Sequence, residues 1–149
     1  SITALTILER ASKRAASELP QEPLVSARLL ATTGEIYLNL GLRQEGMADL
    51  EQALARLPAR GEDRARILLK LAYATTRANA VDQSARHIAA AEAAFDPDTA
   101  TGRILAADVL EQKGLLLHAR GDYRGAVQAL SASIDAIRPQ GGQLWEPLA

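Results

Sequence analysis

Four prolines recur at nearly equal intervals along the chain, and this spacing restricts the possible folds more than any other feature. Pro20, Pro58, Pro97 and Pro139 lie 38, 39 and 42 residues apart, and each closes a stretch with helical periodicity. A proline cannot continue a helix, because it lacks an amide hydrogen and its ring clashes with the preceding turn. A period of this length is typical of proteins built from stacked repeats. We therefore expect repeated helical units.

Apolar residues recur with the same spacing in two of these units. Both sets are spaced by 3, 4 and 3 residues and lie 80 residues apart: Met47, Leu50, Leu54 and Leu57, then Val127, Leu130, Ile134 and Ile137. This spacing places each set on one face of an amphipathic helix. A helix pair cannot bury such a face alone, so we expect neighbouring pairs to cover it.

The composition also favours helix, with 30 Ala and 23 Leu against 12 Val and Ile together. The expected fold class is all-α, with antiparallel helix-turn-helix repeats stacked as an α-solenoid of about seven helices. The expected helices span 3–18, 23–40, 44–57, 63–78, 81–95, 100–120 and 122–137. We expect Gly41 and Gly121 to end helices in the left-handed conformation, which a residue without Cβ adopts at no steric cost.

The whole chain, 1–149, is expected to form one domain. Its expected parts are a flanking or capping helix in 1–20, helix pairs in 23–58, 63–97 and 100–139, and the start of a truncated repeat in 140–149. The first residue is Ser1 rather than methionine, so we expect the sequence to be a piece of a longer protein.

The segment GLLLHARGDYRGAVQALSASIDAIRPQ resembles a tetratricopeptide repeat, a helix-turn-helix unit with small residues where its helices cross. The resemblance covers roughly residues 23–139. It is carried by Leu30, Gly34, Tyr37, Gly41 and Pro58, by Leu68, Ala72, Ala85 and Pro97, and by Gly114, Leu117, Gly121, Tyr123, Ala126 and Pro139. The repeats here are longer than the family's usual period of about 34 residues, and HEAT-like repeats are the alternative fold.

The N-terminal text LTILERASKRAASELPQEPLVSARLLATTGEIYLNLGL is similar to repeat segments of large bacterial signalling proteins, such as receptor-like serine/threonine kinases and repeat-bearing transcriptional regulators. That similarity implies a non-catalytic sensor or scaffold part. It also implies a cytoplasmic location, or an extracytoplasmic one if the parent protein is a membrane receptor.

Motifs for catalysis are missing from the sequence. It contains no P-loop, GxGxxG or GxSxG motif and no cysteine, and His87 and His118 lie in different repeats. With a net charge of −1 and 3% aromatic residues, the chain lacks the features of a nucleic-acid binder. We therefore expect no enzymatic activity, cofactor, metal site or nucleic-acid partner, and no membrane insertion.

The tetratricopeptide resemblance implies a concave binding surface lined by the first helix of each pair. The expected groove residues are Arg28, Thr32, Glu35 and Asn39, then Arg66, Lys70, Tyr73 and Arg77, then Asp108, Glu111, Leu115 and His118. The middle set forms a basic strip with one aromatic ring, which suits a carboxylate or an acidic segment. We expect a protein-interaction or scaffold module that captures a peptide or helix in this groove. The alternatives are a self-associating structural module, hence a homo-oligomer, and a small-molecule sensor.

Overall fold

The computed structural model describes residues 3–18 and 21–138, and the described residues form seven α-helices and no strand. The helices are α1 (Ala4–Ser17), α2 (Pro23–Asn39), α3 (Arg43–Ala55), α4 (Glu62–Arg77), α5 (Val81–Glu92), α6 (Ala100–Ala119) and α7 (Tyr123–Ile137). This confirms the expected helical class, and helix ends lie close to the expected ones. The largest difference is at α5, which ends at Glu92 because Ala93 to Phe95 turn away before Pro97. The repeat start expected in 140–149 lies outside the described residues.

The same tight turn joins the helices of three successive pairs. Gly41, Asn79 and Gly121 each have a positive φ, of 80°, 59° and 83°. The amide of the residue after each turn donates a hydrogen bond to a carbonyl five residues earlier, at 2.8 to 2.9 Å. This is the Schellman geometry that closes a helix end. The left-handed conformation expected at Gly41 and Gly121 is therefore confirmed.

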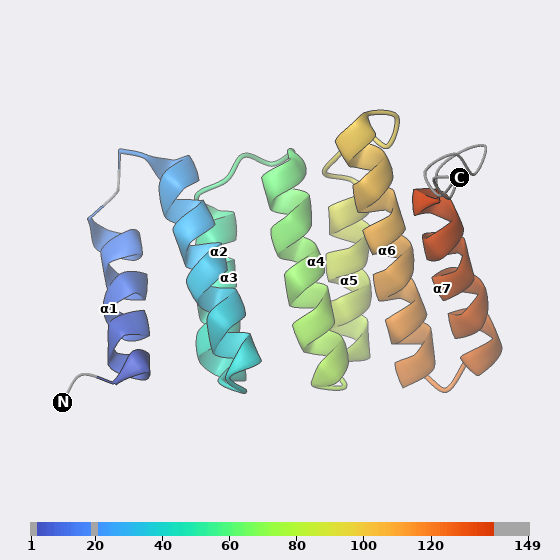
Figure 1. Cartoon of the computed structure of the whole chain (residues 1–149), viewed down its shortest axis with the longest axis horizontal. Helices are drawn as coiled ribbons and strands as arrows, with labels where there is room; N and C mark the ends of the chain where they lie inside the picture. The colour runs from blue at the N-terminus through green and yellow to red at the C-terminus, as the bar shows by residue number, and fades with distance from the viewer. Residues whose placement is uncertain (1–2, 19–20, 139–149) are drawn as a thin grey trace, which may run out of the picture.

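The helices follow one another in chain order from α1 at one end to α7 at the other, with α3 behind α2 in this view (Figure 1). The closest packing is within the pairs α2–α3, α4–α5 and α6–α7, and α4 also contacts α2, α3 and α6. Two apolar clusters meet on α4: Ile67 and Leu71 pack with α1, α2 and α3, whereas Leu68 and Leu69 pack with α5 and α6. The central helix is therefore buried from both sides. None of the described helices is long and apolar enough to span a bilayer.

Residues without large side chains allow the paired helices to approach closely. A Cβ added to Gly34 would lie 2.9 Å from the carbonyl oxygen of Gly46, and one added to Gly46 would lie 2.8 Å from that of Gly34. In the third pair, a Cβ on Gly114 would lie 2.7 Å from Leu130 Cγ and 3.3 Å from the carbonyl oxygen of Ala126. The helices of these two pairs therefore cross at glycines.

The two matching apolar stripes have different surroundings. On α3, Leu50 is fully buried, and Met47, Leu54 and Leu57 pack against the core cluster. On α7, the expectation of a buried stripe is wrong, because every member except Leu130 is exposed. No helix of the described residues follows α7, so nothing there corresponds to α4. Of the two tyrosines that carry the family resemblance, Tyr37 is buried and Tyr123 is exposed.

A buried carboxylate links the first three helices. Asp49 on α3 accepts hydrogen bonds from Ser12 Oγ on α1, at 2.8 Å, and from Thr33 Oγ1 on α2, at 2.6 Å. A carboxylate has capacity for both donors, and burial makes an unmade bond costly. Asp49 therefore holds α1 against the first complete pair.

We predict that Ala126→Leu destabilises the fold by about 1–3 kcal/mol, because the added bulk overpacks the crossing of α6 and α7. Ala136 is exposed on the same helix, so Ala136→Leu is the matched control and should leave stability nearly unchanged. Chemical denaturation measures both variants. Equal midpoints for the two would contradict the packing described for Ala126.

We also predict that Asp49→Ala lowers the free energy of unfolding by about 1–3 kcal/mol. The change removes the carboxylate that accepts hydrogen bonds from the buried hydroxyl of Thr33 and the half-buried hydroxyl of Ser12. The free energy of unfolding in urea measures this loss. Glu51→Ala, at an exposed position of the same helix, serves as the control. The prediction fails if both variants unfold at the urea concentration of the unmodified chain.

Candidate binding pocket

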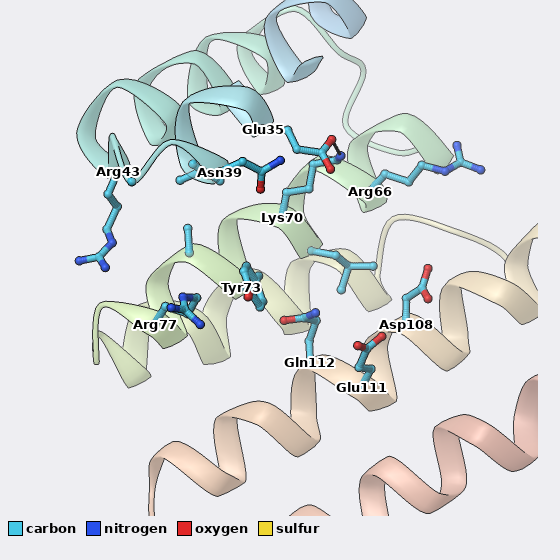
Figure 2. A pocket seen from close by; sticks show the side chains of 14 residues that line it. Glu35, Asn39, Arg43, Arg66, Lys70, Tyr73, Arg77, Asp108, Glu111 and Gln112 are labelled. Atoms are coloured by element: carbon cyan, nitrogen blue, oxygen red, sulfur yellow. Dashed lines mark hydrogen bonds and ion pairs between the residues drawn. The ribbon is translucent and has the colours of Figure 1, made fainter. Parts of the chain in front are cut away.

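An open pocket of about 700 Å³ lies between α2, α4 and α6 (Figure 2). These are the first helices of the three pairs, and the turn after α2 brings in the start of α3. The lining residues are Glu35, Leu38, Asn39, Gly41, Arg43, Arg66, Leu69, Lys70, Tyr73, Ala74, Arg77, Asp108, Glu111 and Gln112.

Most of the expected groove residues line this pocket. They are Glu35 and Asn39 from α2, Arg66, Lys70, Tyr73 and Arg77 from α4, and Asp108 and Glu111 from α6. Their spacing of three and four residues places each set on one face of its helix. Because the three helices lie next to one another, these faces combine into one surface.

Four other expected residues lie outside the pocket lining: Arg28, Thr32, Leu115 and His118. The guanidinium of Arg28 forms an ion pair with Asp63, at 3.1 Å. The ring of His118 packs edge-on against Tyr123, with centroids 5.3 Å apart. Arg28 and His118 therefore have protein neighbours away from the pocket.

The basic strip on α4 carries less free positive charge than the sequence suggests. Lys70 forms an ion pair with Glu35 of α2, and Arg66 lies 3.9 Å from Glu62 and 4.0 Å from Asp63. The guanidinium of Arg77 lies over the ring of Tyr73, 5.7 Å from its centroid, which is a cation–π geometry. The basic strip expected on α4 is therefore partly neutralised, since Lys70 pairs with Glu35 across the helix interface.

Unpaired charges of opposite sign stand on different sides of the pocket. Figure 2 shows Arg43 and Arg77 on one side and Asp108 and Glu111 on the other, with Tyr73 between them. Within residues 3–18 and 21–138, none of these four charged groups has an ion-pair partner within 4 Å. The pocket therefore has its unpaired cations on one side and its unpaired anions on the other, with Arg66, which lies near Glu62 and Asp63, on the side of the anions.

Two polar groups on α6 are partly withdrawn from water at this pocket. Burial raises the pKa of the Asp108 carboxyl, and the positive charge of Arg66 partly opposes that rise. The side-chain oxygen of Gln112 is buried and has no hydrogen-bond partner among the described residues. A buried acceptor without a partner costs free energy, so a donor supplied by a ligand would be favourable there.

The groove expected from the sequence did not include six of the lining residues: Leu38, Gly41, Arg43, Leu69, Ala74 and Gln112. Arg43 begins a second helix, and the expectation considered only first helices. The Gly41 turn brings it beside the end of α2, and the short distance from that turn was the available signal. Gln112 lies four residues after Asp108, so helical spacing placed it on the same face.

Neither histidine joins a metal-binding cluster among the described residues. Within the described part of the chain, no three His, Asp or Glu side chains gather closely enough to hold a metal ion. Burial lowers the pKa of His87, a change that the charge of Glu51 opposes and that of Arg86 reinforces. His87 lies on α5, away from the pocket lining.

No protein-family model matches this sequence, and no curated protein matches it either.

We predict that Asp108→Asn raises the melting temperature at pH 7 relative to the unmodified chain. Burial raises the pKa of Asp108 above its ordinary 3.8, so just above that pH the folded state retains a proton that the unfolded state has released. The free energy of unfolding therefore falls as the pH rises through this window, and Asn removes the loss.

Thermal melts from pH 3 to 7 measure the difference in melting temperature between Asp108→Asn and the unmodified chain. This difference should vanish below the ordinary pKa of an aspartate, 3.8. Asp98→Asn, at an exposed position, is the control. An Asp108→Asn difference that stays constant at every pH would rule out this titration.

Proposed function

We propose that the chain is an interaction module of the tetratricopeptide type, whose pocket between α2, α4 and α6 captures a peptide segment of another protein. The observation that carries this proposal is the polarised pocket, with Arg43 and Arg77 facing Asp108 and Glu111 across Tyr73. A segment with an acidic group toward the arginines and a basic group toward the carboxylates would satisfy both sides. Arginine holds carboxylates through paired hydrogen bonds, which adds directional selectivity.

The repeat type is supported by features shared between pairs. The three pairs have the same turn, and two of them have a close helix crossing at a glycine. Two ion pairs between α2 and α4, Arg28–Asp63 and Glu35–Lys70, each join residues 35 positions apart. The equal separation of the two pairs indicates that α2 and α4 keep one register along their length, as neighbouring units of a repeat stack do.

A small-molecule sensor is the second candidate, because the volume falls in the range of about 300–1,000 Å³ usual for such sites. Those sites are mostly apolar and enclose their ligand. This pocket is open and carries charged side chains from four helices. These properties favour an extended, charged segment over a compact apolar ligand.

The direct test is selection from a phage-displayed library of random twelve-residue peptides against the purified full chain. We expect enriched peptides to carry an acidic and a basic residue at a constant separation. A selection that yields no enriched peptide, or only apolar ones, would overturn the proposal.

We predict that Arg43→Glu with Arg77→Glu weakens binding of a selected, fluorescein-labelled peptide by at least about tenfold, or about 1.4 kcal/mol. The physical reason is the loss of two charge-assisted contacts to the acidic group of the peptide. Fluorescence anisotropy measures the affinity.

Arg86→Glu with Arg103→Glu is the matched control, since it changes the net charge equally at exposed positions outside the pocket. Equal weakening by both pairs would show that binding depends on overall charge. That result would exclude recognition in the pocket.

A further inference from the structure

Helix α7 presents an exposed apolar face on the side away from the pocket. The exposed fractions are 64% for Tyr123, 64% for Val127, 58% for Ile134 and 60% for Ile137. These residues are three, four or seven positions apart, so with Leu130 they form one continuous stripe. A contiguous apolar patch on a protein surface typically marks a site of association.

The matching face on α3 is covered by a neighbouring helix. Residues with the same spacing on α3 pack against Ile67 and Leu71 of α4, and Leu50 there is fully buried. No helix of the described residues covers the corresponding stripe of α7. The surface therefore suits another amphipathic helix laid along it.

The charges beside the stripe are self-complementary when two copies of α7 run antiparallel. In a two-fold pairing centred on Leu130, positions equally far before and after that residue face each other. Tyr123 then faces Ile137, since each lies seven residues from the centre. Arg124, six residues before the centre, comes one residue away from the position opposite Asp135, which lies five residues after the centre and pairs with Arg138 of its own helix at 3.8 Å. The two-fold axis repeats this contact, so the dimer has two cross-pairs, each between Arg124 of one copy and Asp135 of the other, as expected of an isologous interface.

The other end of the molecule is less suited to the same face. Helix α1 exposes Leu5 and Ile7 but also carries Arg10, Lys13 and Arg14 on its exposed surface. Head-to-tail contact would therefore press several charged side chains against the apolar stripe of α7, and charge is costly to bury unpaired.

We propose that α7 binds α7 of a second copy of this chain, antiparallel about a two-fold axis near Leu130. The interface buries the stripe from both copies and pairs Arg124 of each with Asp135 of the other. None of the residues that line the pocket belongs to α7, so the dimer leaves both pockets open. This inference does not depend on the proposed peptide binding.

Sedimentation equilibrium of the full chain over a wide concentration range tests this proposal. We expect a monomer–dimer equilibrium whose dissociation constant rises by about a hundredfold or more in Val127→Asp with Ile134→Asp, because central apolar residues dominate such interfaces. Both positions are exposed in the monomer, and circular dichroism checks that the variant stays helical. Ile7→Asp with Leu40→Asp, at exposed apolar positions elsewhere, is the matched control and should leave the dimer unchanged.

A charge-reversal cycle tests the geometry. Arg124→Asp and Asp135→Arg should each weaken the dimer, and the combined variant should restore it, because the cross-pairs form again with reversed sign.

Three results would overturn the proposal. One is a monomer at every concentration. If the fluorescence of Trp145 also shifts in the Val127→Asp, Ile134→Asp variant, the chain covers the apolar face of α7 with its own residues. The second is a dimer weakened by the Ile7→Asp control, which indicates head-to-tail contact. The third is a dimer that none of the α7 variants weakens.

Discussion

Direct contact between helix backbones is the constraint on which this arrangement depends. At the first crossing, Gly34 and Gly46 leave no room for a Cβ on either helix, and Gly114 leaves none at the crossing of α6 and α7. Tight pairing brings Leu30 of α2 and Leu50 of α3 into one cluster, and that cluster packs on α4. Bulk at the crossings would separate the helices and open gaps, and packing to native density does not tolerate such gaps.

Helix α4 connects the core to the candidate site. Its buried side holds both apolar clusters, whereas Lys70, Tyr73 and Arg77 on its outer side line the pocket. The rigid packing of α4 therefore fixes the position of these side chains relative to α2 and α6. The ion pair between Lys70 and Glu35 belongs to this interface. It leaves Arg43, Arg77, Asp108 and Glu111 as the pocket charges without an ion-pair partner among the described residues. The polarity of the pocket thus results from which charges the packing satisfies.

Helix α7 shows that one pattern can have two outcomes. The stripes on α3 and α7 have the same spacing, yet one is covered by α4 and the other is open to solvent. Burial of an apolar stripe depends on a neighbour that the stripe itself does not specify. If that neighbour is a second copy, association through α7 and ligand capture in the pocket use separate surfaces of the same molecule.

The sequence alone determined the helices, their turns and the faces that carry charge, because periodicity, Gly41, Gly121 and the prolines act locally. Eight of the twelve expected groove residues line the pocket, because helical spacing places them on one face of each first helix. Only the tertiary structure decided which charges remain free, as with Lys70 and Glu35, and which apolar stripe is covered. These outcomes depend on residues about 35 positions away or on another helix, and local sequence does not encode distances between helices.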